Sequence, residues 1–281
     1  CAGLLSSASP AYAQRVSAAA QQQAVRDGEV RVWVMLRDNA QGKRGAAPTL
    51  HPRVKQDVDG VLSALPARAR SKVVRRFERV PAFVLQADAK TLAALGRDRR
   101  VARVDTGGSG HAVAPDESSV MNQVHQLAAL GVGGAGMKVG IVDSGIDTNH
   151  TDFLGRIVGQ QCFCSVGTGC CPNGGSSQSG AGAAEDDHGH GTNVAGIIGG
   201  DGTVAPRGAL PAANLVAVKV LDRNNRFNTT SDVVAALDWL ATQHPDIDAV
   251  NLSLGTDTLL AGDCDSAAAW TAALASAAKR D

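Results

Sequence analysis

The chain has 281 residues, 44% of them hydrophobic, and this length can bury a sizeable core in one large domain or two smaller ones. Basic and acidic side chains number 27 each, so the charge balance indicates neither a nucleic acid nor an anionic membrane surface as a partner. No apolar run approaches the length of a transmembrane helix.

The N-terminal residues have features of an export signal. A short apolar stretch precedes Ala11-Tyr12-Ala13, which has the small-x-small form of a signal-peptidase site. A frayed terminus rich in Ala and Ser is the alternative, and a lipid-modified Cys1 is a third interpretation. We expect residues 1–27 to be the remnant of an export signal followed by a linker, in a secreted or periplasmic protein.

Cysteines are concentrated in one loop. Cys162, Cys164, Cys170 and Cys171 are close together amid Gly, Ser, Pro and Asn, and none of the pairs has the two-residue gap of a zinc knuckle. This favours disulfides formed in an oxidising compartment over a metal site. Three pairings of the four cysteines remain open, and Cys264 has no evident partner.

Residues 28–106 predict a small α/β domain with the order strand, helix, strand, strand, helix, strand. An apolar helix stripe runs from Val54 to Leu65 and stops at Pro66, while Asp88 can cap the second, short helix. The expected strands are 29–36, 72–78, 82–87 and 101–104. This order is typical of a ferredoxin-like sandwich.

Residues 116–281 predict a larger α/β domain, joined to the first by a Gly-rich linker at 107–115. One expected helix is capped by Ser231 and ends before Pro245. The other expected elements are a helix at 116–130, strands at 137–142, 215–221 and 247–254, and an Ala-rich helix at 267–278. Strands that alternate with helices indicate a parallel sheet covered on both faces.

Two polar motifs stand at the expected edge of this sheet. Asp143 follows a buried strand directly, and His190 lies between two glycines at an expected helix start. A carboxylate can orient an imidazole and stabilise its protonated form, while the imidazole takes a proton from a nucleophile. The pair therefore predicts two members of a nucleophilic relay.

Val-Gly-Ile-Val-Asp-Ser-Gly-Ile-Asp at 139–147 and Asp-Asp-His-Gly-His-Gly-Thr-Asn-Val-Ala-Gly at 186–196 resemble the Asp and His motifs of the subtilisin-like serine peptidases, the subtilases. The chain order Asp, His, Ser is that of subtilisin itself. The resemblance implies that Asp143 orients His190, the general base and acid. Val-Asn-Leu-Ser-Leu-Gly at 250–255 is similar to the family's substrate-binding strand, which implies that Ser253, Leu254 and Gly255 pair with an extended peptide.

The same resemblance implies that residues 28–106 are an inhibitor propeptide, which assists folding and then blocks the cleft with its C-terminal tail. The maturation cut would fall in or near the linker. The expected partners are peptide substrates and the chain's own propeptide, and the expected state is a monomer. No cofactor is required, although 147–152 could supply oxygen ligands to the calcium that many family members bind; a solvated turn is the alternative.

The nucleophile itself has no match. No stretch resembles the family's Gly-Thr-Ser segment or its oxyanion Asn, and Ser144 and Ser253 belong to the other motifs. We therefore expect this chain alone to be inactive, as a fragment of a secreted peptidase precursor truncated at both ends. The alternatives are a non-catalytic inhibitor or peptide-binding protein with a degenerate peptidase half, and a metal cluster of Asp186, His188 and His190.

Overall fold

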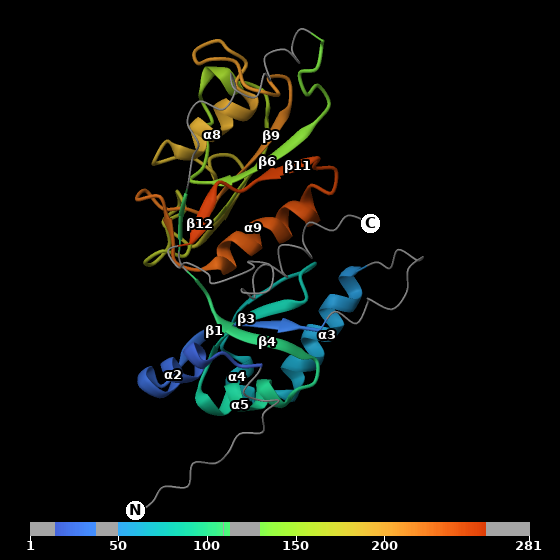
Figure 1. Cartoon of the computed structure of the whole chain (residues 1–281), viewed down its shortest axis with the longest axis vertical. Coiled ribbons are helices and arrows are strands. Elements are labelled where there is room, and N and C mark those ends of the chain that lie inside the picture. Colours follow the sequence, from blue (N-terminus) through green and yellow to red (C-terminus); the bar gives the residue numbers. More distant parts are fainter. Residues whose placement is uncertain (1–14, 38–49, 109, 113–129, 257–281) are drawn as a thin grey trace, which may run out of the picture. The chain divides into compact units, whose positions relative to one another are not determined.

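The computed structural model describes residues 15–37, 50–108, 110–112 and 130–256, and the chain divides between Gly107 and Gly108 into two compact units (Figure 1). The signal-peptidase motif, Cys1, Cys264, nearly all of the expected helix at 116–130 and the expected helix at 267–278 lie outside the described residues. In the described ranges, no helix is long and apolar enough to cross a membrane.

The first unit is built on a four-stranded antiparallel sheet with the order β2-β3-β1-β4. Its strands are β1 (Val30–Leu36), β2 (Val73–Arg76), β3 (Ala82–Ala87) and β4 (Val101–Thr106). Its helices include α3 (Leu50–Ala64), α4 (Ala67–Arg70) and α5 (Ala89–Arg97). The connections from β1 to β2 and from β3 to β4 each pass over one intervening antiparallel strand, which gives the ferredoxin-like order, so the prediction of a small α/β sandwich is confirmed.

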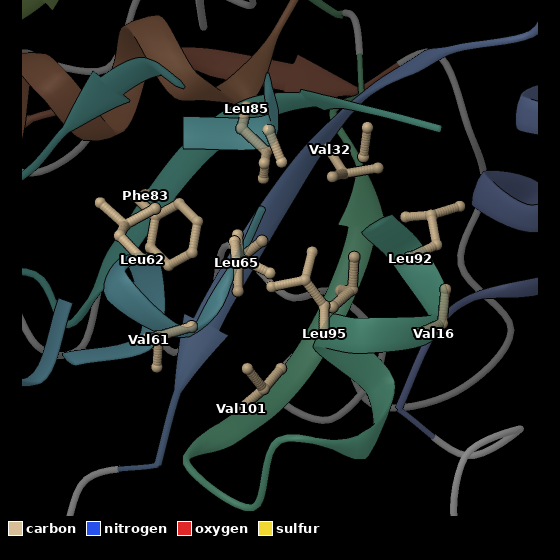
Figure 2. Packing of buried hydrophobic residues seen from close by; sticks show 14 of the residues in the cluster. Val16, Val32, Val61, Leu62, Leu65, Phe83, Leu85, Leu92, Leu95 and Val101 are labelled. Atoms are coloured by element: carbon tan, nitrogen blue, oxygen red, sulfur yellow. The ribbon is translucent and has the colours of Figure 1, made fainter. Parts of the chain in front are cut away.

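The core of this unit lies between the sheet and its helices (Figure 2). The predicted apolar stripe of α3 contributes Val61 and Leu62, which are buried against Phe83 of β3. Asp88 caps α5 as expected, because its Oδ1 accepts a hydrogen bond of 2.7 Å from the Thr91 N–H. The apolar stripe and the capping residue were therefore sufficient to predict helices α3 and α5 from the sequence.

Helix α2 (Ala18–Asp27) lies in the range that was expected to be a linker. It begins after Ser17, whose hydroxyl accepts from the Ala20 N–H, and Val16 bridges to Val104 of β4. Ala20 is buried in the core of the first unit. The packed domain therefore starts before residue 28, and the sequence did not indicate this because alanines form a weak apolar stripe.

The second unit contains a five-stranded sheet with the order β11-β6-β9-β7-β8. The strands are β6 (Lys138–Asp143), β7 (Ile157–Phe163), β8 (Ser177–Ser179), β9 (Asn214–Lys219) and β11 (Ala249–Asn251). All neighbours are parallel except β8, which is antiparallel to β7. A short 3-10 helix, η2 (Thr151–Phe153), follows β6.

Helices cover both faces of this sheet. Successive side chains of a strand point to opposite faces, so Ile141 belongs to the cluster that packs on α8 (His190–Gly199), whereas Val142 belongs to the cluster that packs on α9 (Thr230–Gln243). The predicted fold, a parallel sheet with helices on both faces, is confirmed. Helix α9 begins one residue after Thr229, which is its cap in place of Ser231.

The expected strand at 247–254 is divided in two. β11 ends at Asn251, and β12 (Leu254–Thr256) belongs instead to a three-stranded antiparallel sheet with the order β10-β5-β12. β10 is Arg226–Phe227 and β5 is Gly110–Ala112. The apolar run at 247–254 does not predict this break, because the residues of β11 and of β12 are both extended.

The cysteine loop contains two nested disulfides, Cys162–Cys171 and Cys164–Cys170. The prediction of a disulfide-pinned loop is confirmed, and one of the three open pairings is selected. The loop is tied to α9, because the Ser165 N–H and hydroxyl both donate to one oxygen of Asp232, at 2.9 and 2.7 Å.

Candidate active site

Asp143 is the last residue of β6 and is fully buried. β6 has parallel neighbours on both sides, β9 and β11. In an open parallel sheet, groups at the carboxyl end of such a strand face the region where helices and loops leave the sheet. The strand therefore presents a carboxylate where chemistry can take place.

His190 is the first residue of α8. The preceding Gly189 has a left-handed backbone, with φ of 96°, which turns the chain into the helix. α8 packs on β6, and His190 Nδ1 lies 2.7 Å from Asp143 Oδ1. The His190 side chain is only 11% exposed, so this hydrogen bond is largely shielded from water.

Two glycines allow the Asp and His motifs to approach so closely. A Cβ atom at Gly191 would lie 2.1 Å from the carbonyl oxygen of Gly145. A Cβ atom at Gly145, whose φ is 115°, would lie 2.5 Å from the carbonyl oxygen of Ala184. Any larger residue would push the backbones apart, so the spacing of Asp143 and His190 depends on both glycines.

The environment of Asp143 has opposing effects on its charge. Burial raises the pKa of the Asp143 carboxyl above its ordinary value, while the hydrogen bonds from His190 and from the Ser144 N–H lower it. Both bonds reach Oδ1, and within the described ranges Oδ2 is buried with no hydrogen-bond partner.

A second acid, Asp186, joins the two motifs. Its Oδ1 accepts from the Ser144 hydroxyl at 2.9 Å, and that hydroxyl accepts from the Gly191 N–H. Its Oδ2 accepts from both the N–H and the hydroxyl of Thr192. Burial alone would raise the pKa of Asp186, but the hydrogen bonds, the strongest from the Thr192 hydroxyl, hold it below the ordinary value.

The lowered pKa of Asp186 predicts a loss of stability in acid. Because the pKa is lower in the folded state than in the unfolded state, the stabilisation is fully present above about pH 4 and is lost as the pH falls through the folded-state pKa. Asp186→Asn should lower the free energy of unfolding at pH 7 by about 1–3 kcal/mol.

Urea unfolding of the full-length protein at pH 7 and pH 3 measures this effect. The difference between wild type and variant should shrink at pH 3, because this pH lies below the ordinary pKa of an aspartate in the unfolded chain and the stabilisation is being lost there. If the free energies of unfolding of wild type and variant differed equally at both pH values, the ionised form of Asp186 would contribute nothing to stability.

His188 does not take part in the pairing of His190 with Asp143. It is exposed, its N–H donates to Asp186, and its ring centroid lies 6.4 Å from that of His190. Among the described residues, no group of three or more His, Cys, Asp or Glu side chains is arranged to hold a metal ion.

Two carboxylates of the segment 147–152 accept hydrogen bonds from backbone N–H groups. Asp152 is fully buried, and its two carboxylate oxygens accept hydrogen bonds from the N–H groups of Val204 and Ala205. Asp147 uses Oδ1 to accept from the Asn149 N–H. These contacts give both carboxylates a structural role as acceptors, and calcium binding by this segment stays a prediction.

The expected substrate-binding residues lie at and just before β12. Ser253 precedes the strand, with its hydroxyl donating to Asn251 Oδ1, while Leu254 and Gly255 are in the strand. Gly255 is the register partner of His111 in β5, and β10 pairs with the other edge of β5. The sequence does not predict β10, because a strand of two residues has no periodicity.

The family model named Subtilase family matches residues 134–280. The chain belongs to the subtilase family. The match includes both Asp143 and His190, together with the parallel sheet that positions them.

Several known proteins are similar to this subtilase. Subtilisin DY of Bacillus licheniformis is 37% identical over 131 residues, which are 46% of this chain and 41% of that protein. Subtilisin E of Bacillus subtilis strain 168 is 30% identical over 190 residues, 66% of this chain and 45% of the relative. The Extracellular serine proteinase of Thermus sp. strain Rt41A is 38% identical over 122 residues, 43% of this chain and 25% of that protein. The matched region is thus less than half the length of each of these relatives.

Proposed function

We propose that the full-length subtilase is a secreted serine endopeptidase, in which His190 is the general base and acid, Asp143 orients it, and a serine outside residues 1–281 attacks the peptide carbonyl. One observation carries this proposal. His190 Nδ1 is bonded to buried Asp143, while its Nε2 is buried and has no hydrogen-bond partner in the part of the chain that the structure describes.

This arrangement fixes the tautomer that a base needs. Because Asp143 is an acceptor, it favours the imidazole form with the proton on Nδ1, which leaves the lone pair on Nε2. Nε2 can then take the proton from a serine hydroxyl as the oxygen attacks, and give it to the leaving amine. The Asp143 carboxylate stabilises the imidazolium formed between these two steps.

We further propose that the chain is made as a self-inhibited precursor, with the ferredoxin-like domain as its propeptide. The segment Gly110–Ala112, which follows that domain, pairs with both β10 and β12. An extended peptide that adds as a strand between two edges is bound through its main chain, as a substrate would be. In this position the segment keeps substrates from the two strands.

Two features support secretion. The relatives include a protein named Extracellular serine proteinase and another named Minor extracellular protease Epr, from Bacillus subtilis strain 168. The two disulfides also suit an oxidising compartment.

Asp143→Asn tests the proposal in the full-length protein. We expect kcat for a peptide substrate to fall by about 10⁴-fold, because an amide at this position would favour the wrong tautomer of His190. Asp147→Asn is the matched control, since Asp147 is in the same motif but its carboxylate accepts from the Asn149 N–H of its own turn and not from His190. Its kcat should equal that of the wild type.

Undiminished hydrolysis by Asp143→Asn would overturn the proposal. A full-length protein that binds peptides but cleaves none would favour the alternative function, a non-catalytic peptide-binding protein.

A further inference from the structure

Lys219 is a buried cation that the proposed relay does not use. It is the last residue of β9, it is the register partner of Asp143, and its side chain is 1% exposed. Burying an ammonium group is costly unless acceptors compensate for the lost water. The contacts of Lys219 therefore point to a role beyond filling space.

The ammonium group contacts both relay motifs. Lys219 Nζ donates to the carbonyl oxygen of Ser144 at 2.7 Å and to Asp187 Oδ1 at 2.6 Å. Ser144 follows Asp143 directly, and Asp187 lies three residues before His190 in the loop that leads into α8. One side chain thus holds the residue after the acid and the loop before the base.

Resting on the function proposed above, we propose that Lys219 is a positioning residue, which holds the Asp143 turn and the His190 loop in the register that the relay requires. Proton transfer needs its groups aligned closely, and a displacement of about 1 Å can lower a rate by about 10²-fold. The two glycines permit the close approach of the motifs, and Lys219 ties their flanking residues together.

Lys219→Met in the full-length protein tests this role, because methionine keeps most of the length of the side chain and removes the charge. We expect kcat to fall by about 10-fold with KM within about twofold of wild type. The proton NMR signal of the His190 Nδ1–H should shift, because it reports the hydrogen bond to Asp143. If Lys219 only stabilised the fold, the substitution would change neither kcat nor the NMR signal.

Lys138→Met is the matched control. Lys138 begins β6, at the end of the strand opposite Asp143, and its Nζ forms an ion pair of 2.5 Å with Asp246. Its loss should leave kcat and the NMR signal unchanged.

Asp187→Ala removes the other partner of the ion pair and is less disruptive, because the Asp187 side chain is 48% exposed. Asp187→Ala should also lower kcat and leave KM unchanged. If Lys219→Met does not fold, this variant alone tests the positioning role of Lys219. Wild-type kcat in Asp187→Ala, or in a folded Lys219→Met, would overturn the positioning role. Inactivity of the wild type itself would instead overturn the proposed function.

Discussion

His190→Ala is expected to lower kcat of the full-length protein by about 10⁴- to 10⁶-fold, the range that subtilisin itself shows on losing a relay residue. The reason is that, in the proposed relay, the proton of the nucleophile passes to Nε2 of His190, whose Nδ1 is bonded to Asp143. Steady-state kinetics with a chromogenic peptide measure the change. KM should change little, because His190 acts on the reacting atoms rather than on the bound peptide chain.

His188→Ala is the control for this experiment. His188 is two residues away in the same motif, but it is exposed and makes no bond to Asp143 within the described ranges. Its kcat should stay within a few-fold of wild type. Equal losses in the two variants would contradict the assignment of the base to His190 and would favour a cluster that needs both imidazoles.

Gly191→Ala is expected to destabilise the second unit by about 3 kcal/mol or more. The added methyl group would lie 2.1 Å from the Gly145 carbonyl oxygen, so α8 and the turn after β6 must move apart. The same movement should separate His190 from Asp143 and reduce kcat. Urea unfolding and kinetics on the same preparation measure both effects.

Gly196→Ala in the same helix provides the opposite case. Among the described residues, a Cβ atom there would meet no heavy atom within 4 Å, apart from the chain next to it in the helix. Alanine should therefore stabilise α8 by about 0.5–1 kcal/mol, because it restricts the unfolded chain more than glycine does. Equal stability of the two variants would show that the contact at Gly191 does not constrain the helix.

The sequence was sufficient to predict features that depend on residues close together in the chain. Asp143 ends a short apolar run rich in β-branched residues and His190 starts a helix, so both could be placed on their elements from the sequence. The order of elements in the small domain followed from one helix stripe, one cap and the alternating strands. The predicted ferredoxin-like and parallel sheets agree with the structure for this reason.

Features that depend on distant contacts could not be predicted. Lys219 appears in the sequence as one polar residue at a strand end, and only the fold places it on Ser144 and Asp187. The pairing of the four loop cysteines needed the path of the loop between β7 and β8. Likewise, β10 and β12 become strands because β5 lies between them, not because of their own composition.

Labelling the active-site serine tests the central proposal most directly. The full-length protein would be treated with a fluorophosphonate, under conditions in which it hydrolyses peptides, and the modified residue identified by peptide mapping. We predict one labelled serine, outside residues 1–281, and no label in His190→Ala. A label on Ser144 or Ser253, or peptide hydrolysis that continues without any labelled serine, would contradict a relay of Asp143, His190 and a separate serine.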